Sequence, residues 1–385
     1  MSRPLRVMCV FGTRPDTIKM APVVHALAAH SQVESIACVT AQHREMLDDL
    51  LELFELRPHY DLDIMTADQT LTDITTRVLI GMEGVLKIAQ PDVVLVHGDT
   101  GTSTAAALAA FYQKIPVGHV EAGLRTSDPW VPFPEEMNRR LTGTLASYHF
   151  APTALAREHL LRENVPPENV IVTGNTVIDA FLQTAAWPEL PKPPGWERLD
   201  PSRAIIIVTA HRRENHAHMR EMCEAMREIV QMPQRPQILW PVHPSPHVRP
   251  IAYAVLGMQD GVVLDDPLGY GEMVSAVRDC TFVLTDSGGI QEEAPCLGKP
   301  VLVMREETER PEGVDAGTLE LTGNTRERIV AAAKRLLTDR AHYERMSRAV
   351  NPYGDGHASN RIVDWLLARL RAGAYPAPFE TQASE

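Results

Sequence analysis

Cysteine is scarce in this sequence, and its cysteines are not spaced for joint chemistry. Five occur among 385 residues, and none forms the C-x-x-C pattern of a redox or zinc motif. They are Cys9, Cys38, Cys223, Cys280 and Cys296. Four of them lie in or beside apolar segments, where a thiol behaves as a small hydrophobic side chain. We therefore expect reduced, mostly buried thiols, no disulfide framework and no metal site.

Excess basic charge and long hydrophobic runs are also missing. The formal net charge is −13, which repels nucleic-acid phosphates, and no basic stripe carries interleaved aromatic residues. No apolar run approaches the roughly 18–20 residues that span a bilayer. The apolar run after the basic N-terminus is too short for a signal peptide, and no small-residue cleavage site follows it. We expect a cytoplasmic protein with no nucleic-acid or membrane partner, in which an anionic ligand meets a local basic pocket.

The length and the pattern of apolar residues favour two α/β domains. A chain of 385 residues exceeds what one hydrophobic core usually supports. Short β-branched runs alternate with segments of helical periodicity, which is typical of βαβ units and parallel sheets. The first series predicts strands at residues 6–11, 35–40, 92–97, 116–120 and 170–173. The second series predicts strands at residues 204–209, 238–242, 262–264, 282–285 and 301–304.

Three segments outside these series bear on how the chain divides. The proline-rich stretch 187–196 is aperiodic and is either an inter-domain linker or a surface loop. Residues 357–371 have the apolar spacing of a helix, which could pack on either domain. Residues 372–385 lack any period, which is typical of a flexible tail.

Polar residues gather just after the strands, at the edge where open parallel sheets bind ligands. The first strand leads into Gly12 to Lys19, a turn opening a helix whose free N–H groups and positive dipole end suit an anion. Arg14 and Lys19 would add positive charge. The turn lacks both G-x-G-x-x-G and a Walker A lysine, which argues against a dinucleotide or P-loop site. An ordinary capped helix with exposed basic residues is the alternative.

Carboxylates follow the next strands of the first half. Asp99 and Glu121 come directly after expected strands, and Glu135 lies in the loop beyond. Each alone is more often a helix cap or an ion-pair partner. If the three converge on one cleft, they raise one another's pKa and so suit acid/base chemistry near neutral pH.

The second half repeats this arrangement. His211 stands beside Arg212 and a second arginine at a strand end, which favours diphosphate binding and acid/base chemistry over a surface charge cluster. Later comes a small-residue turn that opens a helix and suits a phosphate. It contains Ser287, Gly288 and Gly289, followed by Glu293, which is placed to accept the hydroxyls of a ribose diol, and by Arg310. Both halves therefore present anion-binding turns.

These motifs together resemble those of the non-hydrolysing UDP-N-acetylglucosamine 2-epimerases. The matching segments of the first half are residues 11–15 (FGTRP), 40–46 (TAQHREM), 96–100 (VHGDT) and 118–126 (GHVEAGLRT). Those of the second half are residues 210–215 (AHRREN), 286–295 (DSGGIQEEAP), 308–312 (TERPE) and 351–356 (NPYGDG). The resemblance spans residues 7–370, apart from the stretch at 188–201.

The resemblance implies a fold and a reaction. The fold has two Rossmann-like domains with parallel sheets facing across a cleft, as in GT-B glycosyltransferases, with UDP in the cleft. The first domain would comprise residues 1–175 and the returning helix 357–371, the second residues 176–356, and the tail residues 372–385. The family interconverts UDP-GlcNAc and UDP-ManNAc by anti elimination of UDP to 2-acetamidoglucal and re-addition at C1, without a redox or metal cofactor. The product would supply ManNAc units for cell-surface polysaccharide or a related glycan.

Site residues follow from the matched positions. The acid/base positions are Asp99, Glu121, Glu135 and His211. The UDP-binding positions are Arg14, Lys19, Ser287, Gly288, Gly289, Glu293 and Arg310. A second UDP-GlcNAc site, at which bacterial members are activated, matches Gln42, Arg212 and His243. The chain departs from the family pattern at Glu45, where some members have glutamine, and at Met273, where an aromatic residue is common. Relatives are commonly homodimers.

Three alternative functions remain open from the sequence. A hydrolysing relative would release free ManNAc and UDP after the same elimination. A glycosyltransferase of the same fold would need an acceptor. A nucleotide-sugar sensor would bind UDP-GlcNAc without turnover, which the complete set of acid/base positions disfavours.

Overall fold

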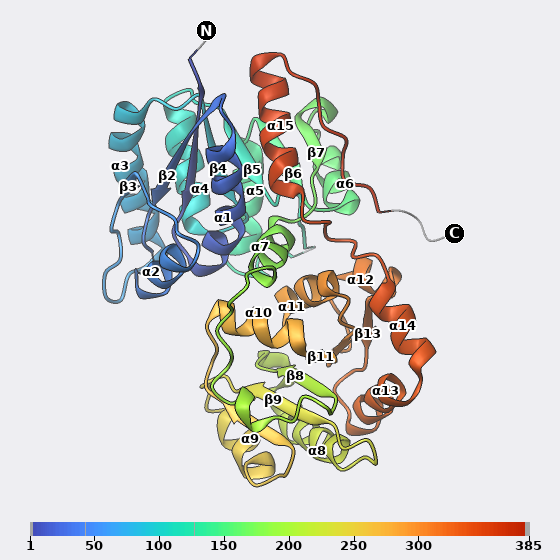
Figure 1. Cartoon of the computed structure of the whole chain (residues 1–385). Helices are drawn as coiled ribbons and strands as arrows, with labels where there is room; N and C mark the ends of the chain where they lie inside the picture. Colours follow the sequence, from blue (N-terminus) through green and yellow to red (C-terminus); the bar gives the residue numbers. More distant parts are fainter. Residues whose placement is uncertain (1–2, 43, 127, 382–385) are drawn as a thin grey trace. The chain divides into compact units, whose positions relative to one another are not determined.

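The computed structural model describes residues 3–42, 44–126 and 128–381, except the side chains of Glu45 and Met46. The chain forms two compact units (Figure 1). Unit 1 combines Met1–Ala180 with Tyr353–Glu380, and Phe181–Pro352 forms unit 2. The expected boundaries were 175/176 and 356/357. The first crossing falls inside helix α7 (Thr176–Ala185), where no loop marks it in the sequence.

Unit 1 is built on a seven-stranded parallel sheet with the order β3-β2-β1-β4-β5-β6-β7. Its strands are β1 (Leu5–Phe11), β2 (Val33–Val39), β3 (Tyr60–Asp61), β4 (Val93–His97), β5 (Val117–Val120), β6 (Tyr148–Ala151) and β7 (Val170–Val172). The buried central strands are nearly continuous apolar runs, as expected for a parallel sheet covered on both faces.

The helices of unit 1 connect these strands. They are α1 (Arg14–Ala29), α2 (Arg44–Leu53), α3 (Leu71–Ala89), α4 (Gly101–Tyr112), α5 (Glu135–Leu145), α6 (Ala154–Arg162), the 3₁₀ turn η1 (Pro167–Asn169) and the start of α7. The last helix of the chain, α15 (Ala358–Arg371), also belongs to unit 1, where it packs against α1. Trp365 on α15 meets the rings of Tyr148 and Phe150 edge-on, at centroid distances of 5.2 and 5.5 Å.

Unit 2 holds a six-stranded parallel sheet with the order β10-β9-β8-β11-β12-β13. Its strands are β8 (Ile205–Thr209), β9 (Gln237–Pro241), β10 (Val262–Asp265), β11 (Phe282–Thr285), β12 (Val301–Val303) and β13 (Leu319–Leu321). Its helices are α8 (Met219–Val230), α9 (Arg249–Leu256), α10 (Tyr270–Asp279), α11 (Gly288–Glu293), α12 (Pro311–Asp315), α13 (Arg326–Thr338) and α14 (Arg340–Arg348), with 3₁₀ turns η2 (Trp196–Arg198), η3 (Arg213–His218) and η4 (Ala294–Leu297).

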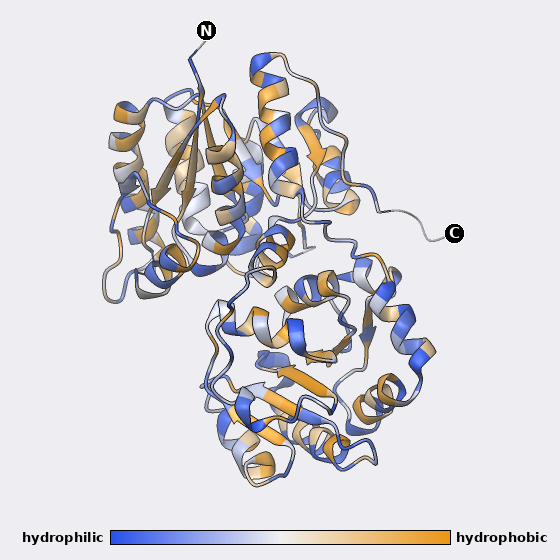
Figure 2. Cartoon of the chain, viewed as in Figure 1, coloured by the Kyte–Doolittle hydropathy of each residue, from blue (hydrophilic) through white to orange (hydrophobic). Residues whose placement is uncertain are grey.

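The two α/β folds with parallel sheets confirm the predicted fold class, and each unit carries its apolar strands inside it (Figure 2). All ten predicted strands are present within one or two residues at each end. Three strands were missed: β3, β6 and β13. They are two to four residues long, and β6 and β13 mix polar with apolar side chains, so they show no β-branched run.

The proline-rich segment was expected to be either an inter-domain linker or a surface loop. Residues 187–196 lie wholly within unit 2, so they form a surface loop and not an inter-domain linker. There the amide of Gly195 donates to Asp265 Oδ2 at 2.8 Å, and Lys192 pairs with Asp279.

The tail was expected to be flexible. Its described part instead runs along unit 1, where the amide of Phe379 donates to the Val172 carbonyl of edge strand β7 at 2.8 Å. The Phe379 side chain is buried, and the ring of Tyr375 meets that of Trp365. Residues 382–385 lie outside the described part.

The predicted burial of the cysteines is confirmed: four are buried and Cys296 is half-buried, and each thiol is free. Among the residues that the structure describes, no helix is long and apolar enough to cross a membrane. In the same ranges, no three His, Cys, Asp or Glu side chains gather as a metal site would require.

Candidate active site

Glu121 directly follows β5 and has an unusual backbone. Its φ of +61° is in the left-handed region, which costs a residue other than glycine about 1–3 kcal/mol and occurs often at functional sites. Gly98, just after the neighbouring strand, has no side chain and so leaves room for that of Glu121. A Cβ on Gly98 would lie 3.2 Å from Glu121 Oε2. The fold therefore imposes strain to hold this carboxylate, which is 9% exposed, at the end of the sheet.

Three side chains surround the Glu121 carboxylate. Lys19 Nζ from α1 lies 2.5 Å from Oε1, and Asn175 Nδ2 donates to the same oxygen at 2.9 Å. His97 Nε2, at the end of β4, lies 3.6 Å from Oε2. Burial opposes ionisation of Glu121, but Lys19, His97 and Asn175 outweigh it and hold its pKa below the usual range. The expectation that clustered carboxylates raise one another's pKa is therefore wrong for Glu121.

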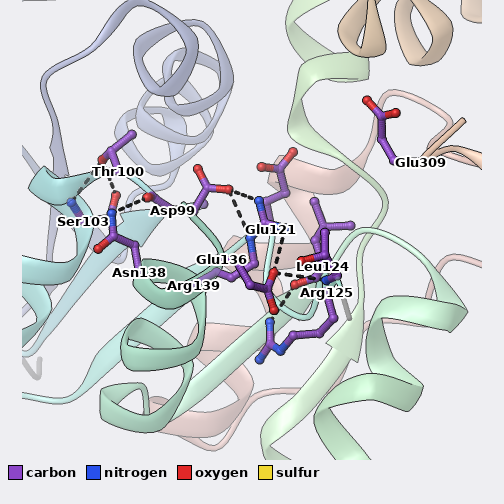
Figure 3. Close-up of polar contacts among 12 residues, drawn as sticks. Asp99, Thr100, Ser103, Glu121, Leu124, Arg125, Glu136, Asn138, Arg139 and Glu309 are labelled. Carbon is purple, nitrogen blue, oxygen red and sulfur yellow. Dashed lines mark hydrogen bonds and ion pairs between the residues drawn. The ribbon is translucent and has the colours of Figure 1, made fainter. Parts of the chain in front are cut away.

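Asp99 follows the adjacent strand, β4, and its pKa is shifted in the opposite direction, upward. Burial raises its pKa, and the charge of Glu121 adds to this effect, although Arg139 works against both. Figure 3 shows Arg139, from α5, between Asp99 and Glu136, and its Nε donates to Asp99 Oδ2 at 3.1 Å. Asn138 Nδ2 donates to the Asp99 carbonyl at 2.9 Å, which fixes the backbone as well.

Glu135 begins α5, one turn before Arg139. Its Oε2 is buried and has no hydrogen-bond partner among the described residues. Its neighbour Glu136 is fully buried and accepts from Arg139 Nη1 at 3.3 Å and Arg140 Nε at 2.7 Å. Glu136 thus anchors the helix, whereas the Glu135 carboxylate retains an unused acceptor.

The turn before α1 differs from the expected anion cradle. Asp16 accepts from the amides of Gly12 at 3.2 Å and Thr13 at 2.6 Å, so these N–H groups are already bonded. Burial raises the pKa of Asp16 to about 6, although these hydrogen bonds oppose the shift. Arg14 is half-buried as the first residue of α1, and Lys19 belongs to the Glu121 cluster.

Gln42, from the expected second site, follows β2 closely. Its Oε1 accepts from Thr102 Oγ1 of α4 at 3.1 Å, and its carbonyl accepts from Gln69 Nε2 at 3.0 Å. The nearby side chain of Glu45 lies outside the described part.

In unit 2, a buried aspartate shapes the turn after β8. Asp286, which follows β11, accepts from the amides of His211 at 3.0 Å and Arg212 at 2.9 Å and from Asn215 Nδ2 at 3.1 Å. The His211 ring stacks on that of His243 at a centroid distance of 5.5 Å. Burial lowers the pKa of His211, and His243 and Arg212 lower it further against the opposing charge of Asp286. His211 therefore favours the neutral form, which can accept a proton.

The expected phosphate turn lies at the start of α11. The amide of Ser287 donates to Thr285 Oγ1 at 2.8 Å. This N–H group was predicted to be available to a phosphate, but it is already bonded. A Cβ on Gly288 would lie 2.7 Å from Glu309 Oε1, so a larger residue here would have to displace the Glu309 carboxylate. Gly289 follows, and Glu293 ends the helix. Arg310 pairs with Glu292 of the same helix.

Glu309 lies between two arginines of unit 2. Its Oε1 is 2.9 Å from Arg212 Nη2, and it also pairs with Arg305. Burial opposes ionisation, but its hydrogen bonds and these arginines hold its pKa below the usual range. Arg212 thus links these groups: it pairs with Glu309 beside Gly288, and its charge acts on His211.

Several residues that shape these clusters have no role predicted from the sequence: His97, Arg139, Asn175 and Asp286. The rule that polar residues just after strands line the site would have found Asn175, after β7, and Asp286, after β11. His97 and Arg139 gave weaker signals, because a histidine inside a strand and an arginine inside a helix usually have structural roles.

Comparison with known proteins identifies the relatives of this chain. A family model described as UDP-N-acetylglucosamine 2-epimerase matches residues 25–367. The UDP-N-acetylglucosamine 2-epimerase of Escherichia coli K12 is 53% identical over 369 residues, covering 94% of this chain and 98% of that protein. A solved structure from Listeria monocytogenes has a TM-score of 0.93 at 46% identity, covering 98% and 100% of the two chains.

A second solved structure is that of UDP-GlcNAc 2-epimerase from Neisseria meningitidis bound to UDP-GlcNAc. It has a TM-score of 0.83 at 45% identity, and 94% of this chain and 100% of that chain are covered. The kitacinnamycin glycotransferase, at 14% identity and a TM-score of 0.61, shares the fold alone. On the extent of these matches, the chain belongs to the UDP-N-acetylglucosamine 2-epimerase family.

Proposed function

We propose that this UDP-GlcNAc 2-epimerase interconverts UDP-GlcNAc and UDP-ManNAc by the non-hydrolysing route. The C2–H and C1–O bonds break, UDP leaves with the C1–O electron pair, and 2-acetamidoglucal forms with a C1–C2 double bond. UDP then re-adds at C1 while a proton is delivered to the opposite face of C2. The product would supply ManNAc units for a cell-surface polysaccharide or related glycan.

One observation carries this proposal: the pKa values of two neighbouring carboxyl groups are shifted in opposite directions. Burial raises the pKa of Asp99, whereas Lys19 and its companions hold that of Glu121 below the usual range. Paired groups whose pKa values diverge are typical of acid/base catalysis. An elimination followed by an addition needs such a pair, because a proton is removed in one step and supplied in the next.

The remaining roles follow the family positions. Glu135 and His211 are proposed as further acid/base groups, and the neutral tendency of His211 suits a proton acceptor. The UDP-binding residues are proposed to be Arg14, Lys19, Ser287, Gly288, Gly289, Glu293 and Arg310.

A second UDP-GlcNAc molecule is proposed to activate the enzyme at Gln42, Arg212 and His243. The His211–His243 stack supports this, because it joins a proposed effector residue directly to a proposed acid/base residue. Initial rates should depend sigmoidally on UDP-GlcNAc concentration, and His243→Ala should make the curve hyperbolic.

We propose that the enzyme works as a homodimer.

Proton NMR in heavy water tests the reaction. Incubation with UDP-GlcNAc alone should give UDP-ManNAc and deuterium at C2 of both sugars, without accumulating UDP. Stoichiometric free ManNAc and UDP would replace the proposal by the hydrolysing reaction. Turnover that requires an added acceptor would indicate a glycosyltransferase, and binding without C2 exchange would indicate a sensor.

A further inference from the structure

Asn175 makes hydrogen bonds through its side-chain nitrogen, its side-chain oxygen and its main-chain amide. It follows β7, just before α7, and is 2% exposed. Its Nδ2 donates to Glu121 Oε1 at 2.9 Å, and its Oδ1 accepts from the amide of Val177 at 3.1 Å, which caps α7. Its own amide donates to the carbonyl of Tyr353 at 2.6 Å. Through this one residue, Glu121 is connected to the segment that re-enters unit 1.

The backbone around Asn175 leaves it little freedom. Gly174 has a φ of +85°, and a Cβ there would lie 3.2 Å from the Cα of Gly354. Gly354 has a φ of +155°, and its Cβ would lie 3.3 Å from Ile178 of α7. Two glycine backbones thus pack directly on each other beside Asn175. The position of its amide group is set by tightly packed main chain.

Charged or titratable groups act on Glu121 from the elements around it. These groups are Lys19 from α1, His97 from β4 and Asp99 from the turn after β4. Lys19 has a flexible side chain, and His97 Nε2 is 3.6 Å away and makes no hydrogen bond within the described residues. Asn175 differs from them because it is neutral and directional. Its hydrogen bond holds one oxygen of the Glu121 carboxylate without adding charge.

We propose that Asn175 is a positioning residue for Glu121, holding Oε1 so that Oε2 keeps one orientation toward the reacting carbon. This inference rests on the proposed function, in which Glu121 exchanges a proton with the sugar at C2. Without the Asn175 amide, Glu121 keeps Lys19 as a partner but gains rotational freedom. Loss of alignment at this scale typically lowers turnover by about 10²-fold.

Asn175→Asp tests the role with little change in shape. Aspartate keeps an acceptor for the Val177 amide, so α7 stays capped, but it cannot donate to Glu121 and places a like charge beside it. We expect kcat for C2 exchange to fall about 10²-fold, with KM for UDP-GlcNAc changed less than about threefold. The pKa of Glu121 should rise, so the acidic limb of the kcat profile should move to higher pH.

Asn175→Ala is the second variant, and Asp339→Ala is its matched control. Asp339 caps α14 in unit 2 by accepting from the His342 amide, so its loss removes a cap without touching the site. The alanine variant of Asn175 should lose turnover like Asn175→Asp, whereas Asp339→Ala should lower only the melting temperature. Equal kcat losses in both alanine variants would show that Asn175 acts only as a helix cap, which would overturn its positioning role.

Glu121→Gln separates the two proposals. If it lacks exchange while Asn175→Asp keeps the wild-type kcat and pH profile, the positioning role is overturned and the role of Glu121 stands. The same holds if Asn175→Asp raises KM alone. Wild-type exchange by Glu121→Gln would overturn the role of Glu121, and the positioning role with it.

Discussion

Asp99 and Glu121 follow neighbouring strands, yet their surroundings shift their pKa values in opposite directions. Asp99→Asn keeps the shape and the contact with Arg139 but removes the titratable proton. We expect turnover to fall by about 10²–10⁴, because one proton-transfer group typically contributes that much. UDP affinity should stay within about tenfold, since the variant leaves the proposed phosphate residues unchanged. C2 exchange and calorimetric UDP titration measure the two effects.

The control is Asp260→Asn, which makes the same chemical change at a surface ion pair with Arg235. It should leave both quantities unchanged. Wild-type turnover in Asp99→Asn would remove Asp99 from the chemistry.

Arg310 is bound to Glu292, which complicates its proposed contact with phosphate. Arg310→Ala should weaken UDP binding by about tenfold or more, because a hydrogen bond to a charged group contributes about 1.5–3 kcal/mol. It also leaves the buried Glu292 without its arginine, so the melting temperature should fall. Arg235→Ala, at an exposed pair, controls for the loss of positive charge. An unchanged UDP affinity would remove Arg310 from the phosphate site.

At the scale of elements, three buried histidines lie on neighbouring strands of unit 1. His97, His119 and His149 belong to β4, β5 and β6, and His119 pairs in register with His149. Burial lowers the pKa of His97 and His149 to about 4 and that of His119 to about 3. Neutral imidazoles are therefore part of the folded sheet at pH 7.

A pH dependence follows from these depressed values. The unfolded chain binds protons on these histidines near pH 6.5, and the folded chain does so only near pH 4 or below. Their stabilisation is therefore complete above about pH 6.5 and is lost as the pH falls toward 4. In urea unfolding, His149→Gln should show a shallower loss of unfolding free energy over this range than the wild type. Parallel curves would mean that His149 titrates normally in the folded protein.

Prediction from sequence worked well for elements and less well for side-chain partners. The β-branched runs indicated both parallel sheets because buried parallel strands must be apolar throughout. The strand-end rule indicated Asp99, Glu121 and His211. It could not indicate that Lys19 would pair with Glu121, because this partner comes from another element. The bonds of Asp16 to the amides of the first turn are local instead, because Thr13 and Asp16 form a capping box, a spacing that the strand-end rule does not use. The short strand β6 and the ordered Phe379 depend on tertiary packing, as the pair of Lys19 and Glu121 does.

At the scale of the whole molecule, each unit has its own apolar core. Leu284→Ala, in β11, removes a fully buried side chain from unit 2 and should cost about 2–5 kcal/mol. Amide hydrogen exchange should then rise in peptides of Phe181–Pro352 more than in those of unit 1. Leu95→Ala, equally buried in β4, is the matched variant and should give the reverse pattern. Equal responses of both units to each variant would show a single cooperative fold.

The return of the chain to unit 1 has a consequence for synthesis on the ribosome. Helix α15, with its buried Trp365, is made only after all of unit 2, roughly 190 residues after Ala180. At about 5–20 residues per second, the first unit waits roughly 10–40 s for the helix that covers Tyr148 and Phe150. During that interval unit 2 is being synthesised, and unit 1 exposes an apolar seam. Molecular chaperones that bind exposed apolar surface should therefore engage the nascent chain at this seam.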